Sequence, residues 1–156
     1  ARGVSALRAR AAGARWSGDA ALRGPNMSAF EWRMRVYWED TDGGGVVYYA
    51  NYLRFLERAR TEWLRARGFD QSNLATERRI LFMVRGLQIE YLAPARLDDT
   101  LIVSCEPQPE GRTTAFFHQR ICRDDVDREL LVEARVRVVC VDAVSLRPRR
   151  LSEYLP

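Results

Sequence analysis

Residues 47–67 carry the pattern that most limits what this chain can fold into. Apolar side chains recur there at spacings of three and four, and further apolar residues widen the stripe. The members are Tyr52, Leu56, Ala59, Trp63 and Ala66, with Leu53, Phe55 and Leu64 beside them. This period is that of an amphipathic helix, and Gly68 supplies a natural stop. A long helix with so wide an apolar face must be covered by a large surface from the rest of the chain.

Strand-like segments make up most of the remaining sequence. Residues 30–38 alternate between apolar and polar side chains, which is typical of a half-buried strand. Residues 71–77 predict a short helical turn, and four further strands are expected at 80–92, 100–108, 113–123 and 129–141. The order predicts an α+β domain in which one long helix is wrapped by a five-stranded antiparallel sheet.

The first 26 residues differ from the rest of the chain. They hold five arginines against one acidic residue, whereas residues 27–156 hold 20 arginines and 20 acids, so the net charge of +4 lies in this stretch. A neutral domain has no broad basic surface, so we expect no nucleic-acid partner. No continuous apolar run marks a secretory signal, and an Arg-rich transit peptide is the alternative. We expect residues 1–26 to be a disordered or non-native extension, from a tag, a misassigned start or translated upstream sequence, before a domain of residues 27–156.

The cysteines and the hydropathy bound the protein's class. Cys105, Cys122 and Cys140 lie far apart in apolar runs without metal-ligand spacing, so we expect buried, reduced thiols in a cytoplasmic protein and no metal site. No apolar run approaches the roughly 20 residues of a membrane-spanning helix, so no stable membrane insertion is expected.

The segment between the first strand and the long helix carries the chemistry. It reads Glu39-Asp40-Thr41-Asp42 followed by three glycines, which allow positive φ and close approach of the backbone. A helix N-terminus has unpaired N–H groups and a partial positive charge, which suit an oxyanion. A carboxylate beside it could attack a carbonyl or activate water. The alternative is structural, with Asp40 or Asp42 capping the helix and the glycines forming a plain turn.

Residues 37–60 resemble the signature of the hotdog-fold thioesterases of the 4-hydroxybenzoyl-CoA thioesterase type, and more closely the Tol-Pal-associated acyl-CoA thioesterases. The resemblance covers residues 30–151. It rests on EDTD-x-GGVVY, the helix ANYL-x-F-x-ERARTEWLR, the turn at 91–99, the pair at 119–120 and the end at 138–142. It implies the hotdog fold and hydrolysis of acyl-CoA to free acid and coenzyme A, with no cofactor.

The resemblance also implies roles for particular residues. The catalytic carboxylate falls on Asp42, and the backbone N–H that polarises the thioester carbonyl falls on Tyr49. Gly45 and Val46 would line the path of the acyl thioester. Tol-Pal-associated members usually carry His where this chain has Tyr49, whereas some 4-hydroxybenzoyl-CoA thioesterases carry Tyr, so the change is compatible with hydrolysis.

Further expectations concern the substrate's carrier and the partners. Coenzyme A carries phosphates, so we expect arginines near the site and favour Arg85 and Arg112. The thiol carrier is coenzyme A or acyl carrier protein. The family joins two sheets into one with sites at the interface, which implies a homodimer or homotetramer. Glu57 and Arg60 belong to the helix signature and are interpreted as a structural ion pair.

Two other functions stay open as alternatives. Hydratases and dehydratases of this fold generally pair a histidine with a carboxylate, and the only histidine, His118, lies far from the motif in an expected strand, where we expect it at the surface or packed on the sheet. A non-catalytic acyl-CoA sensor is the second alternative. Within the thioesterase hypothesis, Asp42 acts either as a nucleophile or as a general base.

Overall fold

The structure, a computed structural model, describes residues 30–155. The elements are β1 (Phe30–Arg35), a 3-10 turn η1 (Trp38–Asp40), α1 (Asn51–Ala66), α2 (Gln71–Glu77), β2 (Ile80–Tyr91), β3 (Thr100–Glu110), β4 (Thr114–Arg123) and β5 (Leu130–Asp142). None of the helices in residues 30–155 has the length and hydropathy needed to cross a membrane. The predicted boundary after residue 26 lies outside the described residues and stays a prediction.

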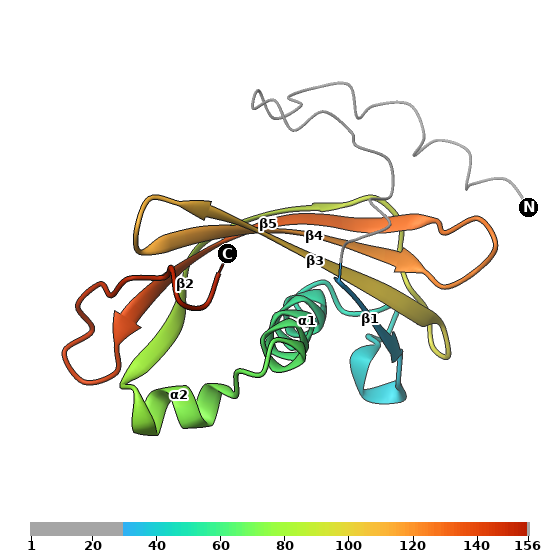
Figure 1. The fold of residues 1–156 in the computed structure, drawn as a ribbon. Helices are drawn as coiled ribbons and strands as arrows, with labels where there is room; N and C mark the ends of the chain where they lie inside the picture. Colours follow the sequence, from blue (N-terminus) through green and yellow to red (C-terminus); the bar gives the residue numbers. More distant parts are fainter. Residues whose placement is uncertain (1–29, 156) are drawn as a thin grey trace, which may run out of the picture.

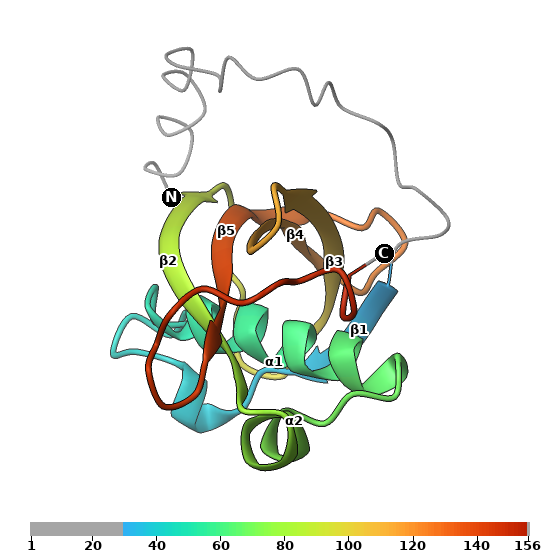
Figure 2. The same cartoon turned by 60° about the vertical axis from the view of Figure 1, so that its left-hand side comes forward.

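The five strands form one antiparallel sheet in the order β1-β3-β4-β5-β2. Figure 1 shows the sheet lying across α1, and Figure 2 shows it curving around the helix. Strands β1 and β2 are the two edges of the sheet. The predicted α+β hotdog fold, with one long helix wrapped by a five-stranded antiparallel sheet, is therefore confirmed.

The buried face of α1 holds the domain together. Phe55, Leu56 and Trp63 are almost fully buried against the sheet. Burial of such a side chain contributes about 1.5–3 kcal/mol relative to exposure, so this face supplies much of the free energy of folding. Two members of the predicted stripe, Leu53 and Ala66, are exposed instead, because they lie at the margins of the face that the sheet covers.

The long helix begins later than its pattern predicts. The periodicity predicts a helix from residue 47, but α1 starts at Asn51. The backbone N–H of Val47 donates to Ala95 O at 2.9 Å, and that of Tyr48 donates to Asp40 O at 2.9 Å. These bonds to distant segments hold residues 47 and 48 outside the helix.

Other element ends follow local signals. Asp70 caps α2 by accepting from the backbone N–H groups of Ser72 and Asn73 at 2.9 and 3.1 Å. Gly68 ends α1 with φ at 84°, in the left-handed region that glycine tolerates. The predicted first strand, 30–38, is shorter than expected and ends at Arg35, because residues Trp38–Asp40 turn into η1.

Candidate active site

The loop before α1 is a short, tightly bonded turn. Thr41 and Val47 form an isolated antiparallel bridge. Inside it, Asp42 N donates to Val46 O at 2.9 Å and Gly45 N donates to Asp42 O at 3.0 Å. Gly45 has φ at 76°, a conformation that a side chain would strain. The glycine-rich segment thus fixes Asp42 at an exposed turn that leads into the helix.

The Asp42 carboxylate is held by one of its two oxygens. Its Oδ1 accepts a hydrogen bond from Gly44 N at 2.7 Å. A Cβ on residue 44 would lie 3.1 Å from that oxygen, so glycine allows this close approach. Among residues 30–155, no group donates to the second oxygen of Asp42. The side chain is therefore oriented yet keeps an oxygen free for chemistry.

Asp40 has a different environment from Asp42. It is buried, and its Oδ2 accepts from Tyr37 N at 2.8 Å while its Oδ1 accepts from the Asn51 side chain at 2.6 Å. Both oxygens are thus occupied in joining η1 to the first residue of α1. Asp40 therefore orders the loop, and its partner Asn51, 11 residues away, is not marked by any local sequence pattern.

The start of α1 presents free backbone donors. The N–H groups of Tyr49 and Ala50 have no hydrogen-bond acceptor among residues 30–155. The N-cap residue, Ala50, provides no side-chain cap, and the first turn contains no acidic residue. The positive end of the helix dipole is therefore uncompensated by its own first turn and can bind a negative oxygen.

A cluster of tyrosines surrounds this helix start. The Tyr91 hydroxyl donates to Tyr49 O at 2.9 Å, and the two rings meet edge to face with centroids 6.4 Å apart. Burial, followed by the nearby Tyr49, raises the pKa of Tyr91, so its hydroxyl keeps the proton that it donates. The ring of Tyr48 lies beside that of Tyr49, tilted by 59°, with the ring centroids 4.9 Å apart. Sequence reasoning assigned no role to Tyr91, because its place opposite the helix start depends on the fold.

The loop of residues 94–99 packs against the loop of Asp42 and holds it in place. Val46 bridges to Arg96, and Arg96 N donates to Asp99 Oδ2 at 2.8 Å. Arg123 binds the same Asp99 carboxylate, Glu129 at 3.3 Å, and Pro94 O at 3.1 Å. This ionic cluster fixes the 94–99 loop, which in turn fixes the strand-like residues after Asp42.

Within a single chain, the two arginines predicted to bind coenzyme A, Arg85 and Arg112, lie far from the loop of Asp42. Arg85 is exposed at the β-bulge of the edge strand β2, between Val84 and Gly86. Arg112 is exposed at the β3–β4 turn. Strand β3 starts beside residue 36 and ends near Arg112, and its 11 residues span roughly 35 Å. Figure 1 accordingly places the β3–β4 turn at the opposite end of the sheet from residues 41–46.

The histidine and the buried thiols do not join Asp42. His118 alternates with two side chains buried on the helix side of β4, so it points to the outer face, where its Nε2 lies 3.2 Å from Gln108 Oε1. Burial raises the pKa of Cys105 to about 12 and that of Cys140 to about 11, which leaves both as protonated thiols. Within residues 30–155, no cluster of three or more His, Cys, Asp or Glu side chains is suited to a metal ion.

The predicted ion pair between Glu57 and Arg60 is wrong. Arg60 donates to Gln119 Oε1 on β4 at 2.8 Å, whereas the exposed Glu57 accepts from the Thr61 hydroxyl of its own helix at 2.8 Å. Gln119 also donates to Leu56 O at 3.0 Å. Arg60 therefore ties the helix to the sheet through an amide rather than through a carboxylate.

Comparisons with known proteins agree with this architecture. Residues 44–130, more than half of the chain, match the Thioesterase superfamily. The chain is 50% identical over 130 residues to the acyl-CoA thioester hydrolase YbgC of Escherichia coli O6:H1, covering 83% of this chain and 95% of that protein. It is 45% identical over 121 residues to the acyl-CoA thioesterase YbgC of Haemophilus influenzae, covering 78% and 87%. A probable thioesterase from Bartonella henselae has a similar structure, with a TM-score of 0.74 at 35% identity over 80% of this chain and 99% of that one. The chain therefore belongs to the thioesterase superfamily.

Proposed function

We propose that this protein hydrolyses acyl-CoA thioesters to a carboxylic acid and coenzyme A, with Asp42 as the reacting carboxylate. The observation that carries the proposal is the state of Asp42, which has one oxygen held by Gly44 and the other free, on the loop that leads to the uncapped start of α1. Two relatives named as acyl-CoA thioester hydrolases or thioesterases support the substrate class.

The same geometry suits two chemical routes. In the first, the free Asp42 oxygen attacks the thioester carbon, the carbon–sulfur bond breaks, and water then hydrolyses the mixed anhydride. In the second, Asp42 accepts a proton from a water molecule as that water attacks, and the thiolate leaves and is protonated. In both routes the N–H of Tyr49 stabilises the oxyanion, while Gly45 and Val46 line the approach.

Substitution of Asp42 tests the proposal directly. Asp42→Asn keeps the shape and the acceptor for Gly44 but removes basicity and nucleophilicity, so we expect kcat for release of free thiol to fall by about 10²–10⁴. Binding of acyl-CoA and the unfolding temperature should change little, because the side chain is exposed. A single turnover in labelled water can identify the first route, since an unlabelled acid with label in Asp42 arises only when Asp42 has formed the anhydride and water attacks the Asp42 carbonyl.

Two nearby carboxylates are the controls. Glu39→Gln changes an exposed acid in the same segment and should leave kcat within about twofold. Asp40→Asn should lower the unfolding temperature, because it replaces one of two buried acceptor oxygens with an NH2 group that faces another donor, and should lower kcat less than Asp42→Asn. Thiol release that survives Asp42→Asn, or binding without any release by the native protein, would favour an acyl-CoA sensor.

We further propose that Arg85 and Arg112 contact the phosphates of coenzyme A. Both are exposed and form no ion pair among residues 30–155, so their guanidinium groups are available. Within a single chain, Arg112 and the Asp42 loop lie at opposite ends of the sheet. A second copy of the chain would therefore have to bring its Arg112 near the Asp42 loop. Arg112→Gln should raise KM for acyl-CoA severalfold and leave KM for the matching acyl-pantetheine unchanged, since that substrate lacks the nucleotide. Equal changes for both substrates would contradict phosphate recognition.

A further inference from the structure

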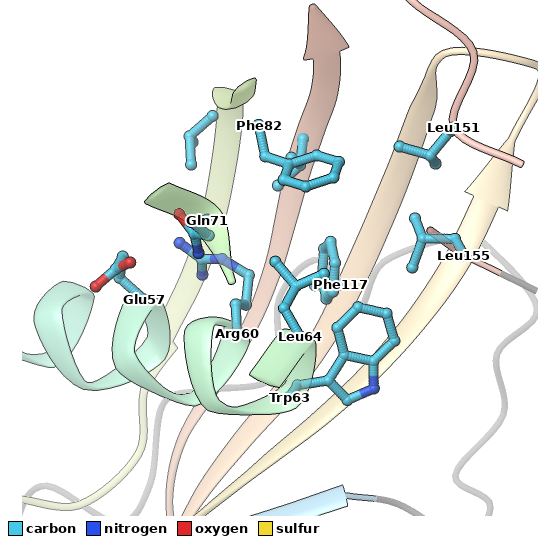
Figure 3. A pocket seen from close by; sticks show the side chains of 11 residues that line it. Glu57, Arg60, Trp63, Leu64, Gln71, Phe82, Phe117, Leu151 and Leu155 are labelled. Carbon is cyan, nitrogen blue, oxygen red and sulfur yellow. The ribbon is translucent and has the colours of Figure 1, made fainter. Parts of the chain in front are cut away.

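A cavity of about 90 Å³ lies between the C-terminal half of α1 and the sheet, apart from the loop of Asp42. This is several times the space that one water molecule needs. Glu57, Arg60 and Gln71 form its polar side, and Figure 3 shows them grouped away from the apolar side chains of Trp63, Leu151 and Leu155. The cavity therefore has a polar rim and an apolar end.

The polar rim is largely satisfied by the protein itself. Arg60 donates to Gln119, Glu57 accepts from Thr61, and Gln71 donates to the same Thr61 hydroxyl at 2.9 Å. A ligand in the cavity thus meets mainly apolar walls, which favours an aliphatic group over a charged one.

An exposed apolar strip leads from the candidate active site to this cavity. Val84, Leu87 and Tyr91 pair with residues of β5 whose side chains are buried on the helix side of the sheet, so they face that side too. They are nevertheless 54%, 38% and 44% exposed, because α1 packs towards β1 and β3 and leaves the β2 margin uncovered. Tyr91 touches Tyr49 at one end of the strip, and Val84 lines the cavity at the other.

The end wall of the cavity comes from the C-terminal segment. Leu151 N donates to Arg112 O at 2.8 Å, and Leu155 N donates to Leu151 O at 3.2 Å, which fixes both leucines. Tyr154 between them packs edge to face on Phe69 and Phe82. The wall is a bonded part of the fold and sets a definite depth.

We propose that Leu151 and Leu155 close an acyl-chain pocket and set the longest aliphatic chain that the enzyme accepts, an inference that rests on the proposed thioester hydrolysis. The α1 residues of the cavity run from Glu57 to Leu64, about 9 to 20 Å along the helix axis from Asn51. An extended chain gains about 1.2 Å per bond, so within one chain an acyl group needs roughly eight bonds to reach the cavity and roughly sixteen to fill it.

Opposite substitutions of Leu155 test the proposal. Thiol release is measured with straight-chain acyl-CoAs from butyryl to stearoyl, and kcat/KM is plotted against chain length. Leu155→Ala deepens the pocket and should shift the ratio of stearoyl to octanoyl turnover upwards by about tenfold, whereas Leu155→Trp, or Leu155→Phe if the larger ring prevents folding, should shift it downwards by a similar factor. Val126→Ala, an apolar truncation at the fully exposed β4–β5 turn, should leave the profile unchanged.

Binding separates this inference from the proposed function. Calorimetric affinities of the same acyl-CoAs are measured in an Asp42→Asn background with and without Leu155→Ala, which needs no turnover. Folded Leu155 variants that keep the native chain-length profile in both turnover and binding would overturn the pocket while leaving thioester hydrolysis intact. A length-dependent affinity that Leu155→Ala shifts would support the pocket even if the native protein released no thiol.

Discussion

At the scale of single residues, Tyr49 presents two different polar groups, a backbone N–H and a phenol. The N–H has no acceptor among residues 30–155 and stands at the helix start, whereas the residue is 62% exposed and its hydroxyl lies beside that of Tyr48. We expect the N–H to matter for catalysis. Tyr49→Phe should therefore keep kcat within about threefold, and Tyr49→His should also be tolerated, because both keep the peptide group.

The measurement for Tyr49 is kcat for thiol release at a saturating acyl-CoA concentration. Tyr49→Pro is the informative opposite, because proline removes the N–H and should lower kcat by about 10²–10³, as the loss of one oxyanion donor does elsewhere. Circular dichroism must show that this variant keeps its helix. A Tyr49→Phe protein as inactive as Asp42→Asn would show that the phenol is chemically required.

At the scale of elements, the site depends on two loops that hold each other. Arg123 at the end of β4 joins Asp99, Glu129 and Pro94 O, and the 94–99 loop bonds to the segment after Asp42. Arg123→Gln should lower the free energy of unfolding by about 1–3 kcal/mol, because it leaves a partly buried carboxylate without its charged donor. It should also lower kcat, because the Asp42 loop loses its support.

Chemical denaturation and thiol-release assays check this expectation together. Arg33→Gln is a matched control, since Arg33 is 69% exposed and pairs with Asp124 at 3.5 Å, an interaction expected to contribute less than about 1 kcal/mol. An Arg123→Gln protein as stable and active as the Arg33→Gln protein would show that the ionic cluster does not position the loop.

The elements also show which features a sequence can predict. The short helix α2 was predicted within its observed bounds, because Asp70 caps it through its own neighbours. The start of α1 was placed four residues early, because the bonds of Val47 and Tyr48 run to Ala95 and Asp40, which no local pattern reveals. The same limit applies to side chains: Glu57 and Arg60 have helical spacing for an ion pair, yet Arg60 binds Gln119 on β4.

At the scale of the whole molecule, strand β2 is an open edge. Within residues 30–155 it pairs with β5 alone, and Met83 and Val84 on it are 42% and 54% exposed. Long apolar edges invite pairing with another strand. We expect two copies to join along β2 into one continuous sheet, which would agree with the homodimer or homotetramer that the family resemblance implies. Light scattering at micromolar concentration should give a mass of at least twice 18.0 kDa.

A charge on this edge tests whether assembly and activity are linked. Met83→Lys would place a charge on the exposed edge strand, on the face opposite the proposed acyl pocket, and should shift the particle towards the 18.0 kDa chain mass, whereas Val126→Lys at the exposed β4–β5 turn should not. Within one chain, Arg112 lies far from the Asp42 loop, so only a second copy could supply it there. The monomeric variant should therefore also show a raised KM for acyl-CoA. A native protein that is monomeric and fully active would contradict the expected assembly and would require every site residue to come from a single chain.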